Sequence, residues 1–457
     1  MHTERAGPFG SSAPARELQA VCAIHSVVRV LGIGTHCDLG DLYQRLLASG
    51  HEVRVHVSDP DSADILLGIV PRGHGLEMDL AWVKQADGLV VFESTGRGEH
   101  QDKLRRRGFR VVGGSALGDR LELDRAFGQH AFRQAGLGVA PSHEVSGWDE
   151  AIAFVERRPA RYVLKFSGEG FASTRTYVGM MDDGRDLLAS LRTQKRLWTL
   201  DEVPAMVLMD HVMGVEVGVG AYFNGRRFLR PANLDWEHKR FFPGDLGELT
   251  GEMGTVVTYR GAERLFDATL ARLEPLFRDA RHVGYVNLNL MVNERGIFPL
   301  ELTCRFGYPG FAILSALHTE PWSAVLERLA DGGDRDVATR EGYAVGVVIT
   351  VPPFPYPDGY ARLSKGAPIT FYPLDDLDRA SMHYGEVAKV DGELVTAGQI
   401  GYVMVVTGAG DDVETARREA LARVRKVVVP NMRYRNDIGE RLVREDLGRL
   451  KRLGWMP

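Results

Sequence analysis

The sequence has little cysteine and no strong charge imbalance. Among 457 residues there are three cysteines, Cys22, Cys37 and Cys304, and none of them forms the CxxC pair typical of zinc and redox sites. We therefore expect neither a disulfide framework nor structural zinc, and a reducing, cytoplasmic location. The 56 Lys and Arg residues stand against 61 Asp and Glu, a net charge of -5. That balance provides no basic field for nonspecific nucleic-acid binding.

Long apolar runs are also missing. No run reaches the roughly 18 residues that a membrane span needs, so we expect no membrane partner. The Gly-, Ser- and Pro-rich opening, residues 1–15, lacks the apolar core of a signal peptide. We predict that residues 1–26 form a flexible tail. The rest of the chain is too long for one ordinary core and should divide into several domains.

The segment 27–118 alternates apolar runs with amphipathic stretches, as βαβ units of a parallel sheet do. The runs are at 27–33, 52–57, 88–92 and 109–112, with the first amphipathic stretch at 39–49. We predict a doubly wound parallel sheet. Gly32 and Gly34 follow the first strand, but the third glycine of the dinucleotide fingerprint is missing. A nicotinamide-dependent dehydrogenase is therefore disfavoured, and a tight turn explains both glycines.

The stretch Asn287–Gly310 places polar side chains in otherwise apolar strands. It reads as two strands joined by a polar turn at Asn293–Gly296. Because side chains alternate along a strand, Glu301 and Thr303 share a face, and the right register would bring Asn287 and Asn289 beside them. The alternative is a solvent-facing hairpin with incidental polar residues.

Glu301 needs a partner if it lies in an apolar strand, because an unpaired buried charge is costly. The partner could be a cation, a metal or a group of hydrogen-bond donors. Converging oxygen ligands suit Mg²⁺, which often shares its coordination shell with phosphate. We therefore predict a magnesium site on this hairpin, which Mn²⁺ could also fill.

A lysine in the middle of the chain lies in a pattern typical of phosphate binding. Lys165 sits in the apolar run Tyr162–Phe166, directly before a loop of small residues at 167–174. The ammonium would supply charge and the open backbone would supply N–H donors. A solvated lysine at a strand edge is the alternative.

From about Leu123 to Gly439 the order of these features resembles the ATP-grasp superfamily. Within it, the chain is similar to the glycinamide ribonucleotide synthetase (phosphoribosylamine–glycine ligase) family. The family's HKR, GD and TGGMG correspond to 238–240, 244–245 and 250–254, its EFNxRFGDPE to the stretch from Glu301, and its closing strand and tail to 392–401 and 434–439. The resemblance implies an N-terminal domain at 27–118, an ATP-grasp domain at 119–330 with a small lid at about 139–204, and a C-terminal α+β cap at 331–457.

The resemblance also implies roles for single residues. For ATP it implies two phosphate cations and an adenine and ribose region: Arg125, Lys165, Asp210, His211, Val212 and Glu216. For the metal it implies Glu301 and Thr303, where the family has asparagine in the second place, with Asn289 able to compensate. Arg305 and Lys239 are the implied partners of the acyl phosphate and the carboxylate. The remaining implied substrate contacts are Gly251, Glu252, Met253, Gly254, Gly307 and Tyr308.

The positions that would meet the acceptor substrates depart from the family. GNGGREHA becomes GIGTHCDL at 32–39, GGMG gains Glu252, and the acids of FGDPE become Tyr308 and Gly310. The ATP-side positions keep their charge. We therefore expect a ligase that uses ATP to join a small carboxylate and an amine of its own, acting as a monomer or homodimer. The alternatives are phosphoribosylamine–glycine ligase itself and a noncatalytic ATP-binding regulatory module.

Two features of the C-terminal part have structural explanations as well as functional ones. His383 could be a catalytic base, but a hydrogen-bonded structural histidine is more common. The Arg-rich segment Arg433–Arg452 is typical of a solvated helix face or an anion contact.

Overall fold

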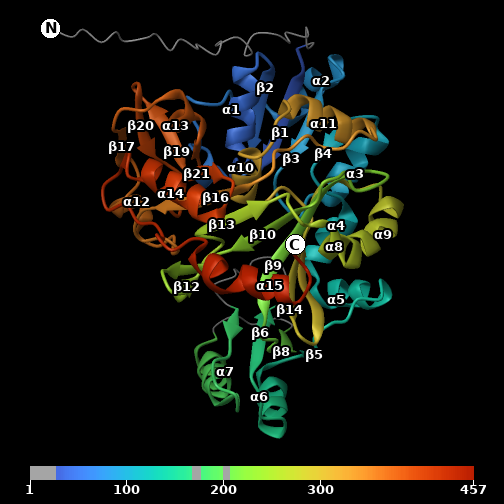
Figure 1. The fold of residues 1–457 in the computed structure, drawn as a ribbon. Helices are drawn as coiled ribbons and strands as arrows, with labels where there is room; N and C mark the ends of the chain where they lie inside the picture. Colours follow the sequence, from blue (N-terminus) through green and yellow to red (C-terminus); the bar gives the residue numbers. More distant parts are fainter. Residues whose placement is uncertain (1–26, 167–175, 199–205) are drawn as a thin grey trace, which may run out of the picture.

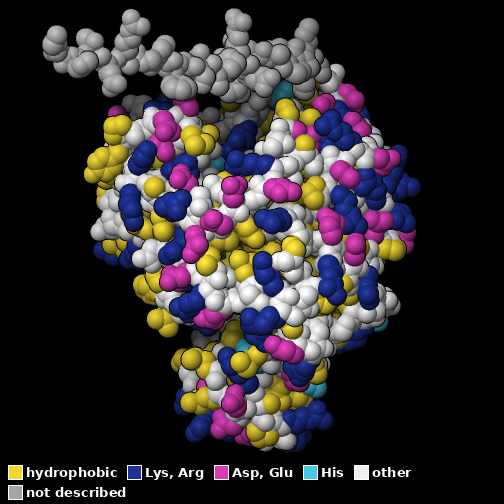
Figure 2. All heavy atoms as spheres, viewed as in Figure 1, with side chains coloured by type: hydrophobic (Ala, Val, Ile, Leu, Met, Phe, Trp, Pro, Cys, Tyr) yellow, Lys and Arg dark blue, Asp and Glu magenta, His cyan; other side chains and the backbone are white. Residues whose placement is uncertain are grey.

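The computed structural model describes residues 27–166, 176–198 and 206–457. The predicted tail at 1–26 and the small-residue loop at 167–174 lie outside the described residues. In these ranges no helix combines the length and apolar character needed to cross a membrane. On the face drawn in Figure 2, Lys and Arg are interspersed with Asp and Glu, so no field of one sign covers it.

The N-terminal part is a parallel sheet covered on both faces. Its strand order is β2 (Glu52–Val57), β1 (Arg29–Gly34), β3 (Leu89–Phe92), β4 (Arg110–Val112). Leu42 and Leu46 of α1 (Gly40–Ala48) pack on one face together with α11 (Trp322–Asp331). Leu80 of α2 (Leu76–Gln85) and Leu104 of α3 (Gly98–Arg106) pack on the other. The predicted doubly wound sheet is confirmed.

An antiparallel sheet of eight strands forms the centre of the molecule (Figure 1). Its order is β15 (Gly296–Thr303), β14 (Val283–Asn293), β9 (Val215–Asn224), β10 (Asn233–Glu237), β13 (Gly254–Thr258), β16 (Tyr343–Thr350), β21 (Tyr402–Gly410), β18 (Met382–Tyr384). The pairing of β13 with β16 carries the sheet across position 330, where the sequence suggested a domain boundary. The ATP-grasp part and the cap therefore share one sheet.

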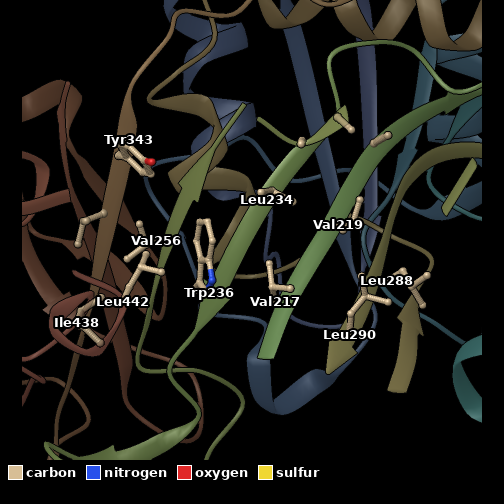
Figure 3. Packing of buried hydrophobic residues seen from close by; sticks show 14 of the residues in the cluster. Val217, Val219, Leu234, Trp236, Val256, Leu288, Leu290, Tyr343, Ile438 and Leu442 are labelled. Carbon is tan, nitrogen blue, oxygen red and sulfur yellow. The ribbon is translucent and has the colours of Figure 1, made fainter. Parts of the chain in front are cut away.

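The two faces of this sheet differ because polar and apolar residues alternate along its strands. Figure 3 shows one face, where Val217, Val219, Leu234, Trp236 and Leu288 belong to the largest apolar cluster. Helices α8 (Glu263–Ala268), α9 (Glu274–Asp279) and α14 (Val413–Val424) contribute to the same cluster. The residues between these apolar positions point to the opposite face, where the candidate site lies.

The expected lid is a small unit at the end of the molecule away from the N-terminal sheet (Figure 1). Its strand order is β5 (Ser142–Val145), β8 (Met206–Asp210), β6 (Tyr162–Phe166), β7 (Tyr177–Val178), with helices α6 (Trp148–Arg157) and α7 (Arg185–Leu197). Trp148, Leu164 and Leu208 are buried in a separate apolar core. This unit completes the fold class predicted from the sequence.

The cap adds a second small sheet to the central one. Its order is β19 (Val387–Val390), β20 (Glu393–Thr396), β17 (Pro368–Phe371), β22 (Val427–Val428). The remaining elements include α4 (Ala116–Leu123), α5 (Arg125–Gln134), β11 (Arg240–Phe242), β12 (Leu246–Leu249), α10 (Gly310–Ser315), α12 (Tyr360–Leu363), α13 (Asp376–Ala380) and α15 (Leu447–Arg452).

His383 is a structural residue rather than a base. Its Nδ1 lies 2.8 Å from Asp41 of α1 and its Nε2 lies 2.9 Å from Thr407 of β21. Both ring nitrogens are therefore engaged, and the side chain joins the cap to the N-terminal part.

Arg435 corrects the expectation of a solvated arginine face. Its side chain is only 2% exposed and pairs with Asp245 at 2.9 Å and with Asp437 at 2.7 Å. The segment after β22 therefore packs into the structure through a buried guanidinium. Arg444, nine residues further along, is 71% exposed and fits the original expectation.

We predict that Arg435→Ala destabilises the protein, because it removes a buried cation and leaves two carboxylates facing each other. The expected loss is about 2–4 kcal/mol, read from the shift of the urea unfolding midpoint. Arg444→Ala is the matched control and should stay within about 0.5 kcal/mol of the parent. Equal midpoints for the two variants would contradict the structural role of Arg435.

Candidate active site

A cavity of about 790 Å³ lies over the polar face of the central sheet, between the lid, α5 and the β11–β12 hairpin. Most residues predicted for the site line it: Arg125, Lys165, Asp210, His211, Val212, Glu216, Lys239, Gly251, Glu252, Asn289, Glu301, Thr303, Arg305, Gly307 and Tyr308. Residues up to 183 positions apart are thus brought together by the strand order.

Met253 and Gly254 do not line the cavity, which corrects their expected contact with substrate. Met253 is fully buried in an apolar cluster with Phe241 and Phe354. Gly254 begins β13, and a Cβ added there would lie 2.5 Å from the carbonyl oxygen of Gly346. The motif positions Met253 and Gly254 therefore serve strand packing.

Glu301 lies at the centre of a cluster of cations. Its Oε2 accepts from Arg125 Nη1 at 2.7 Å and from Lys165 Nζ at 3.2 Å, and its Oε1 lies 3.4 Å from Lys239 Nζ. Arg125 starts α5, Lys165 comes from β6 of the lid, and Lys239 follows β10. The Lys165 ammonium is the main reason that the pKa of Glu301 is held well below its usual range, despite partial desolvation of the carboxylate. These cations offset the cost of desolvating the partly buried Glu301 carboxylate.

Lys239 connects this cluster to two further carboxylates. Its Nζ lies 2.9 Å from Glu237 and 3.4 Å from Glu216. Burial lowers the pKa of Lys239, but Glu237, Glu216 and Glu301 together raise it well above its usual value. Lys239 therefore stays charged. The three cations and three carboxylates form a balanced network.

The predicted register of the hairpin is confirmed. Asn289 pairs across the sheet with Glu301, and Asn287 pairs with Thr303. The face thus carries carboxylate, amide and hydroxyl oxygens, which fit a hard cation bound together with phosphate. The described residues contain no group of three or more His, Cys, Asp or Glu side chains suited to a metal. A metal ion here would therefore depend on Glu301, the amide oxygen of Asn289, water and the ligand.

The far end of the cavity has an apolar slot beside the linker after β8. Ala140, Met209 and Val212 belong to one apolar cluster there, with Val163 and Met291 packed against it. All five line the cavity. The backbone N–H groups of Asp210 and His211 donate to the carbonyls of Pro141 and Arg161. These two N–H groups are therefore already engaged, and a purine in this slot would have to form its hydrogen bonds with other groups of the linker.

Arg305 is held by a residue that the sequence interpretation missed. Its Nη2 lies 3.2 Å from Glu122 of α4, which also accepts the Cys304 N–H at 3.0 Å. The Glu122 carboxylate is the main cause that raises the pKa of Arg305. Glu122 lies on a helix and shows none of the strand periodicity that revealed Glu301.

Asn233, Asp235 and Glu237 of β10 also line the cavity and were missed. They alternate with Leu234 and Trp236, which point into the apolar cluster. This pattern is the same signal that singled out Asn287 and Asn289, so it could have identified them.

Comparisons with known proteins place the site in a family context. Two family models match the chain: "Phosphoribosylglycinamide synthetase, ATP-grasp (A) domain" at residues 123–311 and "Phosphoribosylglycinamide synthetase, C domain" at residues 344–441. The phosphoribosylamine–glycine ligase of Ralstonia nicotianae is 27% identical over 353 residues, covering 75% of this chain and 81% of that relative. The ligase of the same name from Nostoc sp. is 27% identical over 357 residues, with 75% and 80% covered.

Solved structures share the fold. The phosphoribosylamine–glycine ligase of Thermotoga maritima is similar with a TM-score of 0.69 at 24% identity, covering 90% of this chain and all 100% of the other. A biotin carboxylase complex from Campylobacter jejuni gives a TM-score of 0.61 at 12% identity, covering 93% of this chain and 98% of the other. These two likenesses concern the fold alone.

We predict a pH-dependent effect of Asp235→Asn on stability. Burial, followed by repulsion from Glu237, raises the pKa of Asp235. A carboxyl whose folded-state pKa lies above its unfolded value favours folding when protonated. With a folded-state pKa of about 7 for Asp235, this contribution is lost as the pH rises from about 4 through about 7. The variant should therefore gain in melting temperature relative to the parent at pH 8 and differ little from it at pH 4. A pH-independent difference would contradict this.

Proposed function

Because the chain belongs to the phosphoribosylglycinamide synthetase family of ATP-grasp ligases, we propose that it joins a carboxylate to an amine through an acyl phosphate. The supporting observation is the cluster of Arg125, Lys165 and Lys239 around Glu301 in one cavity. A carboxylate is a poor electrophile, and transfer of the γ-phosphoryl group of ATP to its oxygen supplies a leaving group. Attack by the amine then forms the amide and releases phosphate and a proton.

The cation cluster suits the triphosphate because its present partners can be exchanged. Arg125 and Lys165 both contact the same oxygen of Glu301. Phosphate oxygens would replace that oxygen as the acceptor for both cations and keep them charged. Mg²⁺ bound with the nucleotide on Glu301 and Asn289 would add neutralisation of phosphate charge.

The reacting groups would meet between Lys239 and Arg305. Phosphoryl transfer depends mainly on positioning and on donors aimed at the developing negative charge. Lys239 lies 3.4 Å from Glu301 and is fixed by Glu237 and Glu216, and Arg305 is fixed by Glu122. Both side chains line the cavity. They would orient the substrate carboxylate, and no protein nucleophile is required.

The acceptor side supports a substrate pair other than glycine and phosphoribosylamine. Glu252 lines the cavity where the family motif has glycine, and Tyr308 stands where the motif has an acid. Glu252 adds a carboxylate and Tyr308 replaces one. The groups that the carboxylate and amine substrates would contact therefore differ from those of the family motif. The names of the relatives support phosphoribosylamine–glycine ligase as the second candidate. Glu301 and Lys165 argue against a noncatalytic module, since ATP binding alone does not need the metal acid.

A phosphate-release screen tests this proposal. Purified full-length protein with ATP and Mg²⁺ is given amino acids and other small carboxylates against amines that include phosphoribosylamine. We expect release that requires both an acid and an amine, with little release from glycine plus phosphoribosylamine. Rapid turnover on that pair would assign the second candidate instead. ATP binding without release from any pair would assign the regulatory module.

We predict that Glu301→Gln abolishes turnover at every Mg²⁺ concentration, because the amide cannot replace the anionic oxygen that binds the ion. The measurement is phosphate release on the best pair from the screen. Glu294→Gln is the control, since Glu294 lies on the turn of the same hairpin and its side chain is 69% exposed. It should keep the parent rate. Turnover by Glu301→Gln at the parent rate would refute the role of Glu301.

A further inference from the structure

The inner part of the cavity differs chemically from the cation cluster. We define the inner subsite by the polar residues that line it away from Glu301: Asn233, Asp235, Glu252, Thr255, Asn287 and Tyr308. None of them is a cation. Two are carboxylates, and the others offer amide or hydroxyl groups. The cavity therefore has a cationic end and an acidic end.

The sheet register places the cationic end and the acidic end of the cavity at opposite ends of one row of paired residues that runs across four strands. Glu301, Asn289, Gly218 and Asp235 follow one another across β15, β14, β9 and β10. Three strand spacings separate Glu301 from Asp235, which is about 14 Å between their backbones. Gly218 makes room for Asp235, because a Cβ there would lie 2.1 Å from its Oδ1. The row can therefore hold a small extended molecule.

Both carboxylates of the inner subsite are buried with an oxygen left unused. Asp235 is 5% and Glu252 is 7% exposed. Oδ1 of Asp235, Oε1 of Glu252, Thr255 Oγ1 and Tyr308 OH have no hydrogen-bond partner among the described residues. Asn233 and Asn287 donate to the other oxygen of Asp235 at 3.0 and 2.5 Å, which fixes its orientation. Buried acceptors without donors are rare and costly, so a ligand donor is expected here.

The charge of the subsite indicates what kind of donor fits. Lys239 forms its direct ion pairs with Glu216, Glu237 and Glu301, and its charge reaches Asp235 and Glu252 only at longer range. Tyr402 contacts only the backbone of Glu252, through its N–H and its carbonyl. Burial raises the pKa of both carboxyls. These carboxyls are therefore costly to charge without a cation beside them. A ligand that carries positive charge and several N–H donors would favour their charged form and satisfy the free oxygens.

We propose that the inner subsite binds a primary ammonium group of a substrate, separate from the atom that reacts. This inference rests on the proposed ligase function, because the ammonium belongs to one of the two ligase substrates. An ammonium that pairs with Asp235 or Glu252 stays protonated and cannot attack an acyl phosphate. The distance to the cation cluster leaves room for a second functional group of the same molecule to react near Lys239. A phosphorylated substrate group would meet like charge in this subsite.

Binding of matched four-carbon probes tests the subsite without turnover. The full-length protein with saturating MgADP is titrated calorimetrically with 1,4-diaminobutane, 4-aminobutanoate and 1,4-butanediol. We expect the two ammonium probes to bind and the diol not to bind. Tighter binding of the diamine assigns the ammonium to the amine substrate, and tighter binding of the amino acid assigns it to the carboxylate substrate. Equal binding of the diol, or no binding of any probe, overturns the proposal.

Substitution of the two carboxylates tests whether they are the residues that bind the ammonium group. Asp235→Asn and Glu252→Gln should each weaken the ammonium probes by about tenfold or more, as expected for loss of a charge-assisted contact. Glu248→Gln is the matched control, since Glu248 is a nearby carboxylate outside the cavity lining. Unchanged MgADP affinity shows that each variant is folded. Unchanged probe affinity in both variants overturns the proposal.

The two proposals can fail independently. The calorimetry requires no phosphate release, so ammonium binding can be present in a protein that catalyses no ligation. Conversely, the best substrates could be an acid and an amine that carry no ammonium group besides the reacting one. If Asp235→Asn turned over that pair at the parent rate, the ligase function would stand and ammonium binding in the inner subsite would be refuted.

Discussion

The partly buried pairing of Glu301 with Arg125, Lys165 and Lys239 is the interaction on which the site depends. It joins the lid, the helix α5 and the central sheet through one carboxylate. Buried charges persist only where each has a partner, and here the partners come from three separate elements. In the proposed function, phosphate oxygens would replace Glu301 as the partner of these cations and a metal ion would bind the carboxylate. Nucleotide binding would then exchange ion pairs instead of exposing charge.

The central sheet serves two purposes with one alternating pattern. Along β10 the apolar residues Leu234 and Trp236 enter the core drawn in Figure 3, and the polar residues between them form the floor of the cavity. Packing on one face therefore fixes the positions of the functional groups on the other. Gly218 completes the arrangement by letting Asp235 lie across the neighbouring strand. The rigidity of the site follows from the core behind it.

Local patterns in the sequence predicted much of this arrangement. The alternation of polar and apolar residues in Asn287–Thr303 predicted the hairpin register. Features that depend on distant partners were missed. Arg435 looks solvated along the chain, yet its partner Asp245 lies 190 positions away. The pairing of β13 with β16 leaves no periodic signal, and Glu122 acts from a helix. Asp235 and Glu237 had the informative alternation and were overlooked.

The continuity of the central sheet limits how the molecule can be divided. Family comparison separates an ATP-grasp part from a C-domain, but hydrogen bonds between β13 and β16 make them one mechanical body. The lid has an apolar core of its own, separate from that of the central sheet. Cutting the gene after residue 330 would leave β13 as a bare strand edge open to aggregation. Exchange of the cap between relatives would therefore carry three of the eight strands, β16, β21 and β18, with it.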